Sequence, residues 1–167
     1  MLARRIAAAT GLPLIHLDAL YWHPGWVATP KDAWARVVAE LVTRDAWVMD
    51  GNYSGTLDAR LRACDTVIFL DYPRWQCVWG VVERRLRFGL GKVRTDIASD
   101  CPERITWEFL RWTWDYPTRT RPKVLEKIRA AAAEKRVVIL RSRAEAERFV
   151  ASLSALPATV SAGLSPE

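Results

Sequence analysis

The chain has 167 residues, a length that suits one ordinary globular domain with a sizeable core. Half of its residues are apolar, yet no apolar run approaches the ~20 residues that span a bilayer, and the first residues lack the order of a signal peptide. We therefore expect a cytoplasmic protein without a membrane anchor. The three cysteines, Cys64, Cys77 and Cys101, show neither close pairing nor the spacing of a metal site, which favours reduced thiols.

The formal charge is +6, and most of it lies in one stretch. Residues 74–123 carry eleven Lys and Arg against six Asp and Glu, a net of +5. A local basic field suits phosphates, either clustered on a small molecule or along a nucleic-acid backbone. A solvated helical face is the plainer interpretation, and for a run of charges it is usually the better one.

Good helix formers open the chain at residues 2–10, and Gly11 suits the position just past a helix end. Residues 12–17 then predict a short strand that closes on Asp18. His16 lies among the apolar residues of this strand. A lone histidine in that setting is more often a core residue than a catalyst.

An aromatic turn at residues 21–26, punctuated by a Pro-Gly pair, precedes the next helix. Thr29, Pro30 and Asp32 have the features of a helix start: a hydroxyl cap, a proline in the first turn and an acid three residues past the cap. The apolar residues that follow recur at helical spacing and predict one buried face, made of Trp34, Val37, Val38, Leu41 and Val42.

Two later strands also end in acidic residues. Residues 47–49 predict a brief strand that leads into Asp50 and a glycine-bearing loop. Residues 65–70 contain an uninterrupted apolar run, Val67 to Leu70, and predict a buried strand covered on both faces, which favours a parallel α/β sheet. Ligands of such sheets lie beyond the carboxyl ends of the strands, so Asp71 would face the site. Asp71 equally suits a cap for the helix begun by Pro73, and both roles stay open.

Two helices rich in tryptophan are predicted within the basic stretch. The first follows residue 74 and has an apolar stripe made of Trp75, Val78, Trp79, Val82 and Leu86. The second starts near Asp100 and carries Trp107, Trp112 and Trp114 among arginines. Aromatic residues interleaved with arginines suit the stacking of bases and the binding of phosphates. Helical spacing nevertheless favours core packing for most of these tryptophans.

A further helix at residues 120–133, a strand at 136–140 and a helix capped by Ser142 and Glu145 follow. We expect one domain over residues 1–152 with a basic insertion at about 84–121. Residues 153–167 are small and polar and predict a loose tail.

The order of these elements, with acids at successive strand ends and an arginine-rich insertion before the last strand, resembles the adenylate-kinase-like P-loop nucleotide kinases. More narrowly, the chain is similar to the small bacterial family of DNA topology modulation proteins. Four motifs carry this resemblance: Leu14 to Asp18, Trp22 to Trp26, Trp47 to Tyr53, and Asp65 to Arg74. It implies a three-layer α/β fold in which helices flank a parallel sheet.

One departure from the family pattern concerns its phosphate loop. In this family a first strand and a glycine-rich loop ending in Gly-Lys-Ser/Thr precede a helix similar to residues 2–9, and neither is found here. That loop supplies the amides, lysine and hydroxyl that hold nucleotide phosphates and Mg²⁺. We therefore expect no useful phosphoryl transfer from the chain as written, and uncovered apolar surface beside the missing strand. Our preferred explanation is that Met1 is a misplaced start and that the protein begins upstream.

With the loop restored, the resemblance implies a kinase that moves the γ-phosphoryl group of ATP to a nucleotide or similar small acceptor. Asp18 and Asp50 would then lie on the acceptor and metal side, and Asp71 near Mg²⁺ or its waters, with Asp18 and Asp71 as the candidate metal ligands. Arg141 and Ser142 would lie beside the adenine. The remaining catalytic candidates belong to the predicted lid, which would close over the phosphates: Arg84, Arg85, Arg87, Arg104 and Arg111.

Two other functions stay open. The basic, tryptophan-bearing stretch at residues 74–123 and the family's name suggest a nucleic-acid-binding regulator, whose affinity should fall steeply with added salt. The other possibility is a non-catalytic remnant that folds poorly or needs a partner to supply the missing strand.

Overall fold

The computed structural model describes residues 2–88 and 106–154, apart from the side chains of residues 84, 87 and 88. The elements of the first half are α1 (Leu2–Thr10), β1 (Leu14–His16), α2 (Leu17–Tyr21), β2 (Trp22–His23), β3 (Val27–Ala28), α3 (Lys31–Leu41), β4 (Val48–Asp50) and the 3-10 turn η1 (Ser54–Thr56). The elements of the second half are α4 (Leu57–Ala63), β5 (Thr66–Leu70), α5 (Arg74–Phe88), α6 (Trp107–Arg119), α7 (Arg121–Ala131), β6 (Arg136–Leu140) and α8 (Arg143–Ser154).

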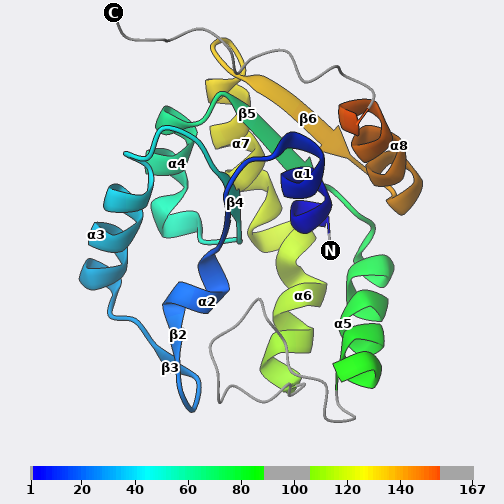
Figure 1. The fold of residues 1–167 in the computed structure, drawn as a ribbon. Coiled ribbons are helices and arrows are strands. Elements are labelled where there is room, and N and C mark those ends of the chain that lie inside the picture. Colours follow the sequence, from blue (N-terminus) through cyan, green and yellow to red (C-terminus); the bar gives the residue numbers. More distant parts are fainter. Residues whose placement is uncertain (1, 89–105, 155–167) are drawn as a thin grey trace, which may run out of the picture.

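The strands form three two-stranded sheets within the described ranges, and two of these sheets are parallel (Figure 1). β1 pairs with β4 in parallel, with Leu14 opposite Val48. β5 pairs with β6 in parallel, with Thr66 opposite Arg136, while β2 and β3 form a small antiparallel hairpin. The predicted mixture of helices and parallel strands is confirmed. The parallel strands nevertheless lie in two separate pairs and do not join into one sheet.

Helices cover both faces of the β5–β6 pair. Successive side chains of β5 point to opposite faces, so they contact different helices. Val67 and Phe69 pack toward α4 and α7, in a cluster built around Leu61, Val124 and Ile128. Thr66, Ile68 and Leu70 line the other face together with side chains of α1 and α8. The molecule therefore has a helix, strand, helix layering around this pair.

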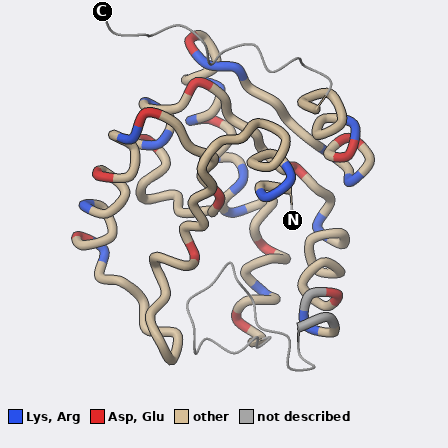
Figure 2. Tube along the Cα trace, viewed as in Figure 1, with Lys and Arg blue, Asp and Glu red and all other residues tan. Residues whose placement is uncertain are grey.

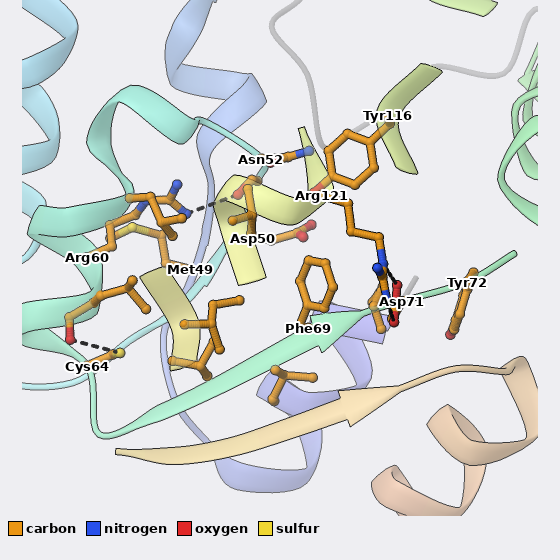
Figure 3. A pocket seen from close by; sticks show the side chains of 18 of the residues that line it. Met49, Asp50, Asn52, Arg60, Cys64, Phe69, Asp71, Tyr72, Tyr116 and Arg121 are labelled. Carbon is orange, nitrogen blue, oxygen red and sulfur yellow. Dashed lines mark hydrogen bonds and ion pairs between the residues drawn. The ribbon is translucent and has the colours of Figure 1, made fainter. Parts of the chain in front are cut away.

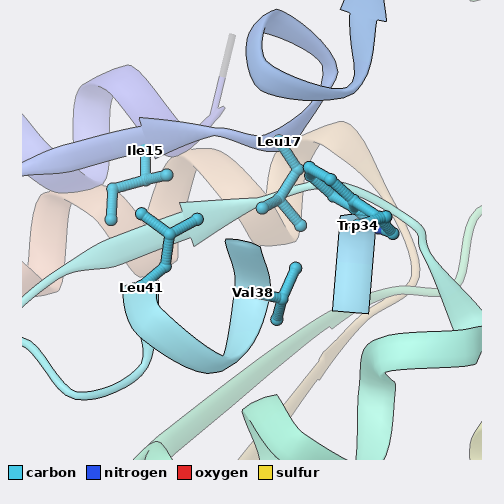
Figure 4. Close-up of a cluster of buried hydrophobic side chains, with 5 residues drawn as sticks. All are labelled: Ile15, Leu17, Trp34, Val38 and Leu41. Atoms are coloured by element: carbon cyan, nitrogen blue, oxygen red, sulfur yellow. The ribbon is translucent and has the colours of Figure 1, made fainter. Parts of the chain in front are cut away.

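A second hydrophobic cluster lies around the β1–β4 pair. Figure 4 shows Ile15 and Leu17 facing Trp34, Val38 and Leu41 of α3. Leu17 and Val38 are fully buried, and Val37 and Val42 pack against the cluster as half-buried residues. The buried face predicted for α3 is therefore confirmed.

Two predicted helix starts can be compared with the structure. Ser142 accepts a hydrogen bond from the amide of Glu145, and Glu145 accepts one from the amide of Arg141, so the predicted cap of α8 is confirmed. The hydroxyl of Thr29 instead donates to the carbonyl oxygen of Tyr21 at 2.7 Å, and α3 has no side-chain cap. The prediction of a Thr29 cap is wrong because the β2–β3 hairpin engages this hydroxyl.

The tryptophans of α5 and α6 are more exposed than the predicted core packing requires. Trp107 is 73% exposed, and Trp75, Trp79, Trp112 and Trp114 are also exposed. The prediction of core packing is therefore wrong for the tryptophans of α6, which lies beside α5 and runs into α7 (Figure 1). The predicted helix start near Asp100 and the predicted tail at 155–167 fall outside the described residues. No helix in the described part of the chain is long and apolar enough to cross a membrane.

Candidate functional site

A cavity of about 420 Å³ lies among β4, β5, α4, α6 and α7 (Figure 3). Its inner part is apolar and is lined by Met49, Leu61, Phe69, Val124 and Ile128. Its polar end lies where the strands stop and is lined by Asp50, Asn52, Asp71, Tyr116 and Arg121. Two of the three predicted strand-end acids, Asp50 and Asp71, are therefore brought to one cavity. This is the arrangement expected at the carboxyl ends of parallel strands.

Asp71 is held by a two-point ion pair with Arg121 at the start of α7. The guanidinium donates from Nε to Oδ1 at 2.5 Å and from Nη2 to Oδ2 at 2.6 Å. These hydrogen bonds lower the pKa of the Asp71 carboxyl and outweigh the opposing effect of burial. Asp71 is therefore a carboxylate at neutral pH and fixes Arg121 at the polar end. The hydrogen bonds described for the Asp71 carboxylate come from Arg121, and the capping role at the start of α5 stays a prediction.

Arg60 of α4 shapes the loop that follows β4. Its guanidinium donates to the carbonyl oxygens of Gly51 at 3.0 Å and of Tyr53 at 2.7 Å. Burial lowers the pKa of Arg60, and these two carbonyl contacts compensate part of the cost of holding the charge there. The Arg60 guanidinium therefore fixes the conformation of the loop between Gly51 and Tyr53.

Gly51 is required in this loop by its backbone and by its neighbour. Its φ of +152° lies in a region that side chains rarely adopt, and an added Cβ would lie 2.8 Å from Cβ of Leu17. Leu17 belongs to the buried cluster and cannot move freely. The chain therefore turns closely past the core here and presents Asn52 to the cavity.

Tyr116 of α6 completes the polar end. Burial raises the pKa of its phenol, and a hydrogen bond with the Asn52 side chain partly opposes that rise. Figure 3 shows Asn52 and Tyr116 facing each other across the opening, with Arg121 beside them. A neutral hydroxyl, an amide and a guanidinium therefore converge on this end of the cavity.

The apolar part contains two half-buried thiols, Cys64 and Cys77. Burial raises the pKa of both thiols, so both are protonated at neutral pH. A protonated thiol is a weak nucleophile, and these cysteines act here as lining groups.

The acids predicted at the first two strand ends have local partners. Nδ1 of His16 lies 3.2 Å from Oδ2 of Asp50, which ties the two strand ends of the β1–β4 pair together. Asp18 lies inside α2 and accepts a hydrogen bond of 2.6 Å from the Tyr53 hydroxyl. Asp18 does not line the cavity, and the prediction that a strand closes on Asp18 is wrong, since β1 already ends at His16. The reason is that the chain enters a helix directly after His16.

The remaining predicted residues do not gather at the cavity where they are described. Arg85 is exposed on α5, and Arg111 lies on α6 with its Nε 3.9 Å from Oδ2 of Asp115. The side chains of Arg84 and Arg87, and the whole of Arg104, lie outside the described residues. Arg141 and Ser142 take part in the cap of α8, and their predicted place beside an adenine stays a prediction.

The described side chains do not fit a Mg²⁺ site by themselves. Mg²⁺ needs oxygen ligands in near-octahedral geometry. Both oxygens of Asp71 bind Arg121, and Asp18 lies elsewhere in a contact with Tyr53. No group of three or more His, Cys, Asp or Glu within the described ranges is arranged to hold a metal ion.

Sequence reasoning missed four residues of the site: Asn52, Arg60, Tyr116 and Arg121. Asn52 belongs to a glycine-bearing loop after a strand, which is a recognisable signal. The other three are brought in by helices far along the chain, and no local pattern distinguishes them. Comparisons with family models, with curated proteins and with solved structures find no match to this chain.

Proposed function

We propose that this protein takes part in phosphoryl transfer, and that the polar end of the cavity binds a nucleotide or similar small phosphate acceptor. One observation carries the proposal: Asp50, Asp71 and Arg121 meet at a single cavity where two parallel strand pairs end. This arrangement suits the adenylate-kinase-like P-loop architecture suggested by the sequence motifs. The cytoplasm, where nucleotide acceptors are available, is the proposed location.

Arg121 is the proposed phosphate-binding group. Its ion pair with Asp71 engages Nε and Nη2, and Nη1 is not needed for that contact. The fork of a guanidinium matches the oxygens of a phosphate, and a fixed guanidinium loses little freedom on binding one. Asn52 and Tyr116 supply an amide and a hydroxyl for further polar groups of the acceptor.

Asp50 is the proposed group that orients the acceptor hydroxyl. Phosphoryl transfer needs little covalent chemistry from a protein, since positioning and charge neutralisation supply most of the rate. A carboxylate at the strand end can accept the proton of the attacking hydroxyl, while Arg121 offsets negative charge. ATP and Mg²⁺ would be bound by a phosphate loop, which the 167-residue sequence does not contain. We therefore expect acceptor binding without ATP turnover from this chain alone.

Titration calorimetry with AMP tests the proposal. We expect AMP to bind, and Arg121→Gln to weaken binding about tenfold or more, because a charged hydrogen bond is lost. Arg119→Gln is the matched control, since Arg119 is exposed at the end of α6 and does not line the cavity. Asn52→Ala is a second variant, at an exposed position, and it should also weaken AMP binding because it removes the amide proposed to contact the acceptor. An absence of AMP binding at millimolar concentration, or equal losses in the two arginine variants, would contradict the proposal.

Nucleic-acid binding is the second candidate, and the exposed tryptophans of α6 favour it. Cζ of Arg74 lies 4.9 Å from the ring centroid of Trp114, and Phe109 and Trp112 stack at 5.8 Å. Exposed rings beside arginines are the groups on which single-stranded bases stack. Figure 2 nevertheless shows acidic and basic residues alternating along α6, so this helix lacks a uniformly basic face.

Fluorescence anisotropy with a labelled single-stranded oligonucleotide distinguishes this candidate from the first. A direct binder should lose affinity steeply as salt rises, and Trp107→Ala should weaken it because stacking on that ring is lost. No binding at low salt would remove the candidate.

A further inference from the structure

The helices α5 and α6 pack side by side (Figure 1) and expose four tryptophan rings to water. The exposed fractions are 62% for Trp75, 60% for Trp79, 73% for Trp107 and 50% for Trp114. A whole tryptophan side chain has an area of about 250 Å², so the four rings together expose roughly 600 Å². The largest apolar patch of a monomeric protein is about 300–600 Å² and is often functional, so this surface indicates a binding partner.

The exposed residues of α5 form one stripe along the helix. The stripe recurs at intervals of four, three and four residues, the spacing of a coiled-coil seam, and consists of Trp75, Trp79, Val82 and Leu86. Another side of α5 faces the core, where Val81 is buried. The stripe therefore faces water, and its far end at Leu86 is exposed.

A similar stripe lies on α6, where Trp107, Leu110 and Trp114 recur at intervals of three and four residues. The two stripes meet where α5 begins, because Cζ of Arg74 lies 4.9 Å from the ring centroid of Trp114 and Trp75 follows Arg74 directly. The two helices run in opposite directions (Figure 1). Together they form one surface made of two antiparallel helices.

The composition of the two helices favours a protein partner. Every basic residue of α5 and α6 is an arginine, and neither helix contains lysine. Tryptophan and arginine are enriched at the centre of protein interfaces, whereas lysine is depleted there. Nucleic acid fits this surface less well, since acidic and basic residues alternate along α6 (Figure 2).

Charge decides which helix of a second copy fits on α5. Helix α5 contains four arginines and one glutamate, a net of +3, whereas α6 contains two arginines, one aspartate and one glutamate and is neutral. Two α5 helices facing each other would therefore repel. A two-fold axis parallel to the helices instead places α5 of each copy on α6 of the other, in opposite directions. The exposed Arg85 near the end of α5 then lies toward the exposed Glu108 at the start of α6 in the second copy.

We propose that this chain forms a two-fold homodimer in which α5 and α6 of two copies make a four-helix bundle. Two copies would bury about 1,200 Å², which exceeds the roughly 1,000 Å² of a specific interface and lies at the low end of the standard size. The dimer should therefore form at about 10–100 µM and dissociate into monomers at lower concentration. The cavity lies on another side of α6, where Trp112 lines it, so the dimer does not depend on the proposed acceptor.

Sedimentation velocity between about 1 and 200 µM tests the proposal without any nucleotide, so its failure is distinguishable from a failure of AMP binding. We expect the average mass to rise with concentration from 19.0 kDa toward twice that value. Trp79→Ala should raise the dissociation constant of the dimer about tenfold or more, because a central ring leaves the interface.

Trp112→Ala is the matched control for Trp79→Ala. Trp112 is also an exposed tryptophan of this helix pair, but it lines the cavity and lies outside both stripes. Its removal should leave the dissociation constant within about twofold. A monomer at every concentration, or equal losses in the two variants, would overturn the proposal.

Charge reversal tests the pairing of α5 with α6. Glu108→Arg should weaken the dimer about threefold or more, and Arg85→Glu in the same chain should restore it. Glu126→Arg changes an exposed residue of α7 and should leave the dimer intact. A dimer that the second substitution does not restore would overturn this pairing. A chain that stays monomeric and binds a single-stranded oligonucleotide through Trp107 would overturn the dimer and assign the surface to nucleic acid.

Discussion

The ion pair between Asp71 and Arg121 joins the carboxyl end of β5 to the first residue of α7. The Asp71 side chain is 11% exposed, so its charge is largely withdrawn from water and depends on Arg121 for compensation. The Asp71 carboxylate therefore has two roles. It stabilises the fold, and it aims a guanidinium at the cavity.

Asp71→Asn should lower the free energy of unfolding by about 2 kcal/mol at neutral pH, because two charged hydrogen bonds are lost. The pKa of Asp71 is lowered in the folded protein by Arg121, so its contribution is complete above the unfolded pKa of ~3.9 and is lost as pH falls through the lower folded value. The difference between the two proteins should therefore shrink below pH ~3.9. Urea unfolding at a series of pH values measures it.

Asp58→Asn is the control for this prediction. Asp58 forms an exposed ion pair with Lys127, and such pairs contribute about 0–1 kcal/mol. Equal losses in the two variants, or a constant Asp71→Asn difference down to pH ~3, would contradict the role given to Arg121.

Gly51→Ala should destabilise the protein by about 2 kcal/mol or more, because the new Cβ would meet Leu17 at 2.8 Å with an unfavourable φ. Gly55→Ala should cost less than about 1 kcal/mol, since nothing lies within 4 Å of an added Cβ there. Thermal unfolding of both variants checks the loop geometry, and a harmless Gly51→Ala would show that the loop does not approach the core as described.

At the scale of single elements, apolar spacing predicts a buried face only where another element lies against it. In α3 the face exists because β1 and β4 pack on it, and Trp34 is 5% exposed. In α5 a similar spacing leaves Trp79 60% exposed. The same sequence pattern therefore has opposite outcomes, and the position of the helix in the molecule decides between them.

Trp34→Ala should cost about 3–5 kcal/mol of unfolding free energy, as expected for removal of a buried aromatic ring. Trp79→Ala should cost less than about 1 kcal/mol, since its ring is mostly in water already. Chemical denaturation of the pair measures the contrast. A large loss in Trp79→Ala would mean that α5 is covered in solution by a surface that the described residues do not provide.

For the molecule as a whole, local signals were enough to predict the strands at 65–70 and 136–140, the α3 face and the Ser142–Glu145 cap. Each depends on residues near one another in the chain. The Asp71–Arg121 pair joins residues 50 positions apart, and Arg60 reaches a loop whose course depends on Leu17. Such contacts follow from the packing of helices around the strands, which no local pattern encodes. Asp18 was misplaced for a related reason, since tertiary packing turns the chain into α2 at once.

The two parallel strand pairs and the cavity at their carboxyl ends together form the candidate site. The two pairs carry Asp50 and Asp71 at their carboxyl ends, and α6 and α7 bring Tyr116 and Arg121 to them. In this account the polar end of the cavity binds the phosphate acceptor, and the exposed tryptophans of α6 are not required for it.

Amide hydrogen exchange of the full chain with and without AMP shows whether the acceptor binds at the strand ends. We predict slower exchange at Gly51, Asn52 and Tyr72 and at the start of α7, because these amides border the polar end of the cavity. Slower exchange confined to α5 and α6, or none at saturating AMP, would contradict the account and move the binding surface away from the strand ends.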